Sequence, residues 1–145
     1  MATTVVRLTF NRLPELARKL PGEVRQICLE TAEAIETRVK TGMAEPKTGL
    51  WHGDHQASAP GEMPAIDTTA LVNSIVAEPD GTGAVVSTNM EYAAHLEYGT
   101  VNMGPRPFFT PAAEEARPGF VRALQVLERR LYWRRGRRRR GCMRR

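Results

Sequence analysis

Residues 23–41, EVRQICLETAEAIETRVKT, contain the longest helical pattern in this chain of 145 residues. Their apolar side chains recur at steps of three and four, so on a helix they share one face. That face holds Val24, Ile27, Cys28, Ile35 and Val39. Charged side chains fill the opposite face. The stretch therefore predicts an amphipathic helix that packs against a core, and Gly42 is its expected end.

Two shorter elements are expected before this helix. Residues 4–10 are β-branched and aromatic with alternating apolar positions, which predicts a strand. Asn11 is a suitable cap for a short helix over 12–20, and Pro21-Gly22 should end that helix.

A hairpin and two short helices are expected in the second half of the chain. Residues 74–78 and 84–88 are strand-like and flank the turn-forming run Pro79-Asp80-Gly81-Thr82-Gly83, which predicts an antiparallel pair. Before the hairpin, Asp67 is the expected N-cap of a helical turn that carries Ala70 and Leu71.

Residues 91–98 have helical spacing, and Gly99 is the expected stop. Tyr92, Ala93 and Leu96 would pack on the inner face of this helix. His95 lies between them and is interpreted as a partly buried packing residue rather than a general base.

The last helix is expected over 110–133. Thr110 suits the N-cap position and Pro111 the first helical position. Its buried stripe would consist of Phe120, Leu124, Leu127 and Leu131. Pro118 falls early in this helix and predicts a kink or a restart there.

These elements together predict an α+β fold. A small antiparallel sheet formed by 4–10, 74–78 and 84–88 would be packed by the two main helices, 23–41 and 110–133. The length suits one domain, which is placed at residues 1–133.

Two extended loops complete the expected domain. Residues 44–66 are rich in proline and glycine and show no apolar period, so this loop is expected to order only against a neighbouring molecule. Residues 102–107 form the second loop.

The charge is divided unevenly along the chain. Ten arginines and no acidic residue fall between Arg129 and the end, while the preceding residues set 11 Lys and Arg against all 16 Asp and Glu. A mildly acidic body of net charge −5 therefore carries a basic segment, and residues 134–145 are interpreted as an arginine-rich tail. An isolated tail of this kind should be extended and mobile because its charges repel one another.

Arginine forks suit phosphate oxygens, so the tail is a candidate contact for DNA. An acidic surface on an adjacent subunit is an equally open partner, and a solvated tail without a partner is the plain alternative. The candidate contact residues are Arg134, Arg135, Arg137, Arg138, Arg139 and Arg140.

Composition excludes several classes of protein. A membrane-spanning helix needs roughly 20 apolar residues, and the apolar runs here are only a few residues long. The N-terminal residues do not resemble a signal peptide. The two cysteines, Cys28 and Cys142, are too different in setting to suggest a disulfide framework, which favours a reducing compartment.

No catalytic arrangement is evident in the sequence. His52, Asp54 and His55 could supply metal ligands from one loop, but no second group completes a site, so a solvated or interface loop is the default interpretation. We expect no metal, no cofactor and no enzymatic activity. A metal hydrolase that uses these three residues is the alternative from the enzyme class.

Three segments of the chain form a more specific pattern. They are SAPGEMPA at 58–65 leading into DTTALVNSI at 67–75, then MEYAAHLEYGT at 90–100, and last PRPFFTPA at 105–112. In order and spacing they resemble the tail-completion (neck, or minor tail component) family of long-tailed bacteriophages and prophages, over about residues 23–131. The family's Thr-Gly before the leucine is replaced here by Thr69-Ala70, and the arginine-rich end is not a family feature.

The resemblance implies a structural virion protein that forms a homo-oligomeric ring at the head-proximal end of the tail. The ring would complete the tail and join it to the DNA-filled head, in contact with other head–tail connector and tail proteins and with no membrane. The chain would be found in the virion, and in the host cytoplasm during assembly. A tail-terminator ring that caps the tail tube is the alternative within this class, and a DNA-binding module is the alternative outside it.

The residues of the motifs are the candidate subunit-interface or motif residues. They are Pro60, Gly61, Leu71, Tyr92, Glu97, Gly99, Thr100, Arg106, Pro107, Phe108 and Phe109. Arg106 should pair with an acid, and Glu97 is the expected partner. Phe108 and Phe109 would either anchor the preceding loop on the chain's own core, which is favoured, or fill a pocket of a neighbour.

Overall fold

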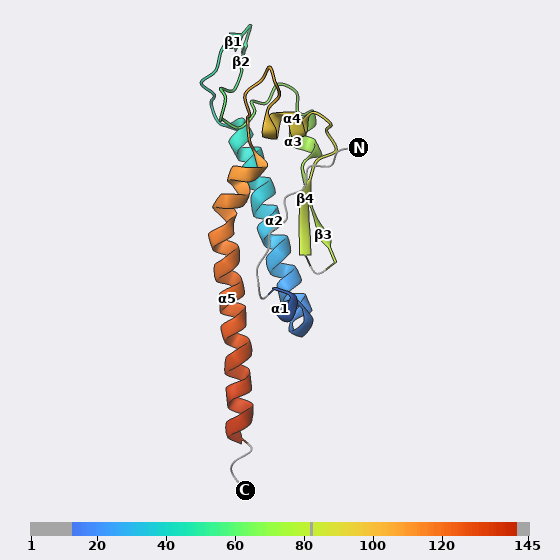
Figure 1. Ribbon diagram of the computed structural model, residues 1–145, viewed down its shortest axis with the longest axis vertical. Coiled ribbons are helices and arrows are strands. Elements are labelled where there is room, and N and C mark those ends of the chain that lie inside the picture. The colour runs from blue at the N-terminus through green and yellow to red at the C-terminus, as the bar shows by residue number, and fades with distance from the viewer. Residues whose placement is uncertain (1–12, 82, 142–145) are drawn as a thin grey trace.

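A computed structural model describes residues 13–81 and 83–141 of the chain (Figure 1). The expected strand at 4–10 and its neighbour Asn11 lie outside the described residues. For Leu13, Glu15, Tyr132 and residues 134–141 the structure describes the backbone and not the side chain.

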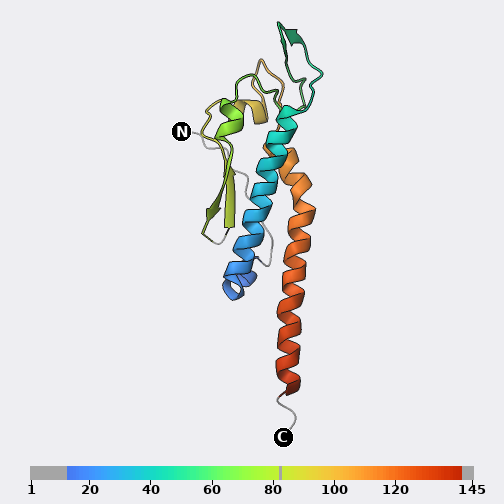
Figure 2. The same cartoon turned by 180° about the vertical axis from the view of Figure 1, so that it is seen from behind.

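The fold is α+β, as the sequence predicts. The elements are α1 (Leu13–Lys19), α2 (Pro21–Ala44), β1 (Trp51–His52), β2 (His55–Gln56), α3 (Ala70–Ser74), β3 (Val76–Asp80), β4 (Gly83–Ser87), α4 (Ala93–Tyr98) and α5 (Phe109–Gly141). Helices α2 and α5 lie side by side along the long axis of the molecule, and the β3–β4 pair lies against α2 (Figures 1 and 2). One end carries β1, β2, α3 and α4, and α5 extends beyond α1 at the other end.

Helix α2 is longer than the sequence predicts. It starts at Pro21, which occupies the first helical turn where its missing N–H costs nothing. It also continues through Gly42, so the expected stop there is wrong. A Cβ at residue 42 would lie 2.2 Å from the Met63 sulfur, so this glycine lets the following loop pack on the helix. Glu45, which precedes Pro46, is extended and ends the helix.

Strands β3 and β4 form the expected hairpin with shifted ends. Val76 pairs with Ser87 and Asp80 pairs with Gly83, so Pro79, Asp80 and Gly83, expected in the turn, belong to the strands. The backbone N–H of Ala77 donates a hydrogen bond of 2.8 Å to the Glu36 carboxylate, which ties the hairpin to α2.

Burial opposes ionisation of Glu36, but hydrogen bonds from Lys40 and from the Ala77 backbone outweigh it and lower the pKa of this carboxyl group. Within the described residues β3 and β4 form a two-stranded sheet.

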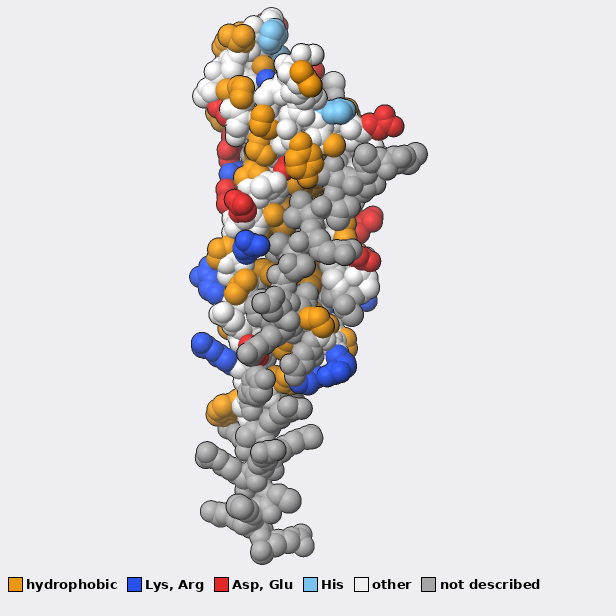
Figure 3. Space-filling view, viewed as in Figure 1, with side chains coloured by type: hydrophobic (Ala, Val, Ile, Leu, Met, Phe, Trp, Pro, Cys, Tyr) orange, Lys and Arg blue, Asp and Glu red, His pale blue; other side chains and the backbone are white. Residues whose placement is uncertain are grey.

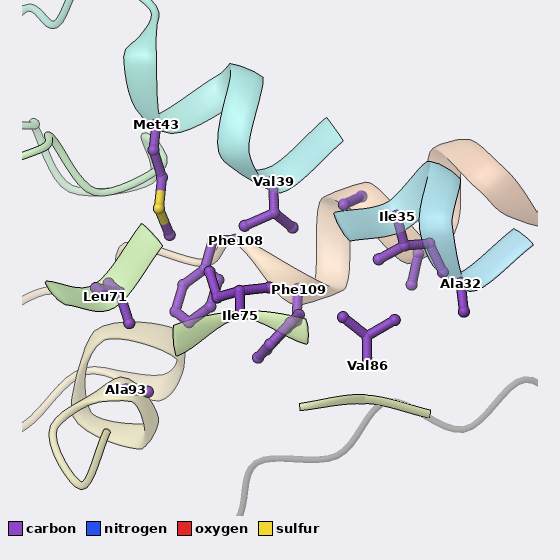
Figure 4. Close-up of a cluster of buried hydrophobic side chains, with 12 residues drawn as sticks. Ala32, Ile35, Val39, Met43, Leu71, Ile75, Val86, Ala93, Phe108 and Phe109 are labelled. Atoms are coloured by element: carbon purple, nitrogen blue, oxygen red, sulfur yellow. The ribbon is translucent and has the colours of Figure 1, made fainter. Parts of the chain in front are cut away.

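The apolar side chains form two clusters along α2. The larger cluster joins the second half of α2 to α3, the hairpin, α4 and the start of α5, with Phe108, Phe109, Ile75 and Val39 fully buried at its centre (Figure 4). The smaller cluster joins α1, the first half of α2 and the middle of α5. Its buried members are Leu16, Val24, Cys28, Phe120, Leu124 and Leu127. Burial raises the pKa of the Cys28 thiol.

Helix α5 differs from the prediction at both ends. It begins at Phe109, so Thr110 lies inside the helix and is not its N-cap. It runs through Pro118 without a restart and continues to Gly141, eight residues beyond the expected end. Arginine is a good helix former, so the segment expected to be an extended tail is helical up to Gly141. The predicted stripe packs on α2 as far as Leu131, which is partly buried.

The two short helices also correct the prediction in detail. Helix α3 begins after Thr69, and no side chain caps it, so Asp67 is not its N-cap. In α4, Ala93 and Glu97 are buried, while His95 is exposed. The interpretation of His95 as a packing residue is therefore wrong, because the inner face of this short helix is taken by Ala93, Leu96 and Glu97.

Candidate functional site

The three motif segments meet at the end of the molecule that carries α3 and α4. The backbone N–H of Gly61 donates to the Pro105 carbonyl at 2.8 Å, which joins the first segment to the third. The Arg106 Nε donates to the Ser58 carbonyl at 3.0 Å, and the Arg106 N–H donates to the Leu96 carbonyl at 2.7 Å. Residues far apart in sequence are thus held together by hydrogen bonds, and we call this assembly the motif site.

Gly99 makes the turn between the second and third segments. Its N–H donates to the His95 carbonyl at 2.9 Å, and its φ of +77° favours glycine. A Cβ at this position would lie 2.8 Å from the Met103 carbonyl oxygen, so a larger residue would not fit. Thr100 then bridges to Met103 through its backbone, which closes the turn. Gly99 therefore ends α4, as predicted.

Glu97 caps helix α5 from the neighbouring helix α4. Its carboxylate accepts hydrogen bonds from the backbone N–H groups of Phe108, Phe109 and Thr110 at 2.8, 3.0 and 2.9 Å, and from the Thr110 hydroxyl. The side chain is 5% exposed. A carboxylate at this place also interacts favourably with the positive end of the helix dipole. Arg106 donates to Ser58, so the expected Arg106–Glu97 pair is wrong.

Phe108 and Phe109 anchor the motif site on the core of the chain itself. Both are fully buried, and their ring centroids lie 4.6 Å apart. Figure 4 shows them beside Ile75, Val39 and Leu71. The favoured within-chain interpretation is confirmed, and they are not available to fill a neighbour's pocket.

The loop at 44–66 is organised by bonds within the chain, so the expectation that it orders only against a neighbour is wrong. The Thr48 hydroxyl donates to the Glu62 carboxylate at 2.6 Å, and the Ala59 N–H donates to it at 2.8 Å. Gly49 and Leu50 exchange backbone hydrogen bonds with Ala57 below the β1–β2 hairpin. A loop without apolar periodicity is thus ordered by polar contacts.

The Glu62 carboxylate is the centre of this loop. Hydrogen bonds from the Thr48 side chain, and then from the backbone N–H groups of Ala59 and Thr48, hold its pKa below the ordinary value. Glu62 lies within the first motif segment, and no role was predicted for it from the sequence. A single glutamate in a proline- and glycine-rich loop carries no periodic signal, so the pattern could not identify it.

The remaining motif residues divide between the interior and the surface. Leu71 is buried, Pro107 is partly buried, and Pro60, Tyr92 and Thr100 are exposed. Large hydrophobic side chains are also exposed at this end, where Figure 3 shows orange side chains interspersed with white ones. They include Leu50, Trp51, Tyr98 and Val101.

A cavity of about 400 Å³ opens beside the motif site. Pro64, Leu71 and Leu96 supply apolar walls, and His55, Asp67 and Arg106 supply polar groups. The cavity therefore offers apolar surface together with one cationic side chain, Arg106, and one carboxylate, Asp67.

The candidate metal residues do not form a site. Among the described residues, no group of three or more His, Cys, Asp or Glu side chains could hold a metal ion, and this search included His52, Asp54 and His55. His52 and His55 pair across the β1–β2 hairpin instead. None of the helices in the described part of the chain is long and apolar enough to cross a membrane.

The candidate DNA-contact arginines, 134, 135 and 137–140, lie on the last turns of α5. Only their backbone is described, so the structure places them on a helix and brings none of them to the motif site. Comparison with protein-family models, curated proteins and solved structures finds no match for this chain.

Proposed function

We propose that this chain is a structural virion protein that forms a ring at the head-proximal end of a bacteriophage tail, completing the tail and joining it to the DNA-filled head. The observation that supports this most is the meeting of the three motif segments. Gly61 bonds to Pro105, Arg106 bonds to Ser58 and Leu96, and Glu97 caps α5. The residues that carry the resemblance therefore act as one structural unit.

The surface of the motif site also supports an assembly role. Exposed large hydrophobic residues that gather on one end of a small protein are typical of protein contacts. Here Leu50, Trp51, Tyr98 and Val101 share the end of the molecule that holds the motif site. On this proposal the chain catalyses no reaction, and its mechanism is complementarity between identical subunits arranged around a closed ring.

Deletion of the gene from the phage or prophage that encodes this chain tests the proposal. The expected result is DNA-filled heads and separate tails, seen by electron microscopy, with joined particles restored by the wild-type gene in trans. Image reconstruction of the restored particles should place the ring between head and tail. A ring at the top of the tail tube with no contact to the head would favour the tail-terminator role. Fully infectious particles without the protein would contradict both roles.

The second candidate is a DNA-binding module, and the continuation of α5 to Gly141 is the observation that favours it. The six candidate arginines lie on a helical segment that follows Leu131, the last residue of α5 in the described apolar clusters. Six phosphate contacts on duplex DNA would give a slope of about −5 for log K against log salt. Deleting residues 134–145 should abolish that binding. If the full chain shows no salt-dependent DNA binding, this candidate is wrong.

The two partners left open for the basic segment are separated by comparing particles with and without DNA. A segment ordered only in full particles contacts DNA, and one that is ordered equally in emptied particles contacts protein. Salt does not distinguish these partners because both contacts are screened.

A further inference from the structure

The motif-site cavity contains an arginine whose binding capacity is only partly used. Arg106 donates to Ser58 through Nε, and its two terminal nitrogens make no hydrogen bond or ion pair within the part of the chain that the structure describes. These nitrogens form the fork that binds carboxylates in a bidentate way. Pro64, Leu71 and Leu96 line the same cavity and offer apolar surface beside the charge.

The β1–β2 hairpin presents the complementary pair of groups. Trp51 is 65% exposed and Leu50 is 78% exposed, so both are unusually open to solvent for their size. Asp54 follows Gly53 in the tight turn, is exposed, and makes no hydrogen bond or ion pair among the described residues. Trp51 lies at the start of β1, paired across the hairpin with Gln56, and Asp54 lies in the turn. We call residues 51–54, which carry this aromatic group and this carboxylate, the hairpin tip.

The hairpin cannot place this tip in the cavity of its own chain. Its second strand already forms part of the cavity wall, through His55 and the following Ala57. Hydrogen bonds between Gly49 and Ala57, and between Thr48 and Glu62, hold the two sides of the base together. Both ribbon views show the hairpin projecting away from the body (Figures 1 and 2). The occupant must then come from another molecule.

We propose that the hairpin tip of one copy docks in the motif-site cavity of a second copy, with Trp51 against Pro64, Leu71 and Leu96 and with the Asp54 carboxylate on the terminal nitrogens of Arg106. The Asp54 carboxylate complements the Arg106 guanidinium, and Trp51 complements the apolar wall; this pairing supports a second copy of this chain as the occupant. Asp67 also lines the cavity, so the Asp54 carboxylate must lie on the Arg106 side of it. The two surfaces are different, so each copy gives one tip and receives one. Such a heterologous contact closes into a ring when the rotation between copies is right. This inference rests on the proposed ring function.

Two variants separate the two halves of the contact. Trp51→Ser removes the tip and leaves the cavity intact. Thr68→Trp fills the cavity from an exposed position on its rim and leaves the tip and the core intact. Trp133→Ser is the matched control, because it removes an exposed tryptophan near the opposite end of the molecule.

Native mass spectrometry should show rings for the wild type and for Trp133→Ser, and loss of rings for each of the other two variants. A mixture of Trp51→Ser and Thr68→Trp should form a heterodimer and nothing larger, because only one working tip and one working cavity can meet. Asp54→Arg should also lose the assembly, because it brings a second cation to Arg106. Where assembly needs other virion proteins, the same variants are scored by their incorporation into particles.

The outcomes separate a failure of the proposed docking contact from a failure of the proposed ring function. If the wild type forms rings and both single variants form them equally well, the docking contact is wrong and the ring uses another surface. If the mixture assembles beyond a heterodimer, the contact is also wrong. If the wild type forms no ring alone or in particles, both the contact and the proposed function fail. Circular dichroism of each variant shows whether a loss of assembly is a loss of folding.

Discussion

At the scale of single residues, the carboxylate of Glu97 determines how α4 and α5 are joined. An ordinary N-cap residue directly precedes its helix and accepts a hydrogen bond with its side chain. Phe108 takes this position before α5, and its side chain has no acceptor atom. Glu97 supplies both oxygens from α4 and binds three successive backbone N–H groups. Glu97, Phe108 and Phe109 are buried, so the two bonds to the phenylalanine N–H groups are shielded from water, and the bond to the Thr110 N–H is partly buried.

Glu97→Ala should therefore be strongly destabilising. Buried N–H groups left without an acceptor cost about 1–3 kcal/mol each, so we expect the free energy of unfolding to fall by about 3 kcal/mol or more. Urea denaturation followed by circular dichroism measures this. Glu91→Ala is the control, since Glu91 is exposed and should change the stability by less than about 0.5 kcal/mol. Equal effects of the two substitutions would show that the cap is unimportant.

Phe108→Ala and Phe109→Ala should each cost about 3–5 kcal/mol of stability, because each deletes a fully buried ring and leaves a cavity. His95→Gln, at an exposed position, should be close to neutral. The same urea experiment compares the three variants, and particle assembly provides a second readout. Normal stability and normal infectious particles for both phenylalanine variants would contradict the anchoring role.

At the scale of elements, the loop at 44–66 should loosen in acid. The pKa of Glu62 is lower in the folded chain than its ordinary value, so its contribution to stability is complete above that ordinary value and is lost as the pH falls through the folded pKa. Hydrogen-exchange protection of the Thr48 and Ala59 amides should drop between about pH 6 and about pH 3, which spans the ordinary glutamate pKa of about 4.3. Glu62→Gln should remove this pH dependence, and an unchanged profile would assign it to other groups.

Helix α5 continues for ten residues after the last member of the described apolar clusters. Its buried stripe ends near Leu131, while the helix continues to Gly141. Deleting residues 134–145 should leave the free energy of unfolding within about 0.5 kcal/mol of the wild type, because no buried residue of the described core is removed. Thermal and urea unfolding measure this. A deletion that instead unfolds the chain would show that the basic segment packs on the body.

At the scale of the whole molecule, we expect the purified chain to oligomerise, alone or on meeting its ring partners. We expect this because apolar residues are exposed at the hairpin end, among them Leu50, Trp51 and Val101. Analytical ultracentrifugation over a range of concentrations should show a discrete species larger than the monomer. A strictly monomeric chain at high concentration, together with virions that lack the protein, would contradict this.

Local patterns were sufficient to predict most of the fold. The helical period of residues 23–41, the hairpin at 74–88 and the glycine stop at Gly99 each depend on neighbouring residues, and all three are present in the structure. Some incorrect predictions concern positions where a residue distant in sequence makes the contact. Thr110 does not cap α5, because the Glu97 carboxylate does, and Gly42 lies inside α2, where its missing side chain leaves room for Met63.

The sequence by itself determined the α+β class, the amphipathic faces of α2 and α5, and the presence of three motif segments, because these follow from residue spacing along one element. Only the tertiary structure decided that Glu97 caps α5 while Arg106 binds Ser58, and that Glu62 orders a loop without periodicity. Each of these contacts joins residues whose separation in the chain carries no pattern. When the helices pack, buried polar groups that have no local partner form hydrogen bonds with the groups that the fold brings next to them. These neighbours are determined by the folded chain and not by the local sequence.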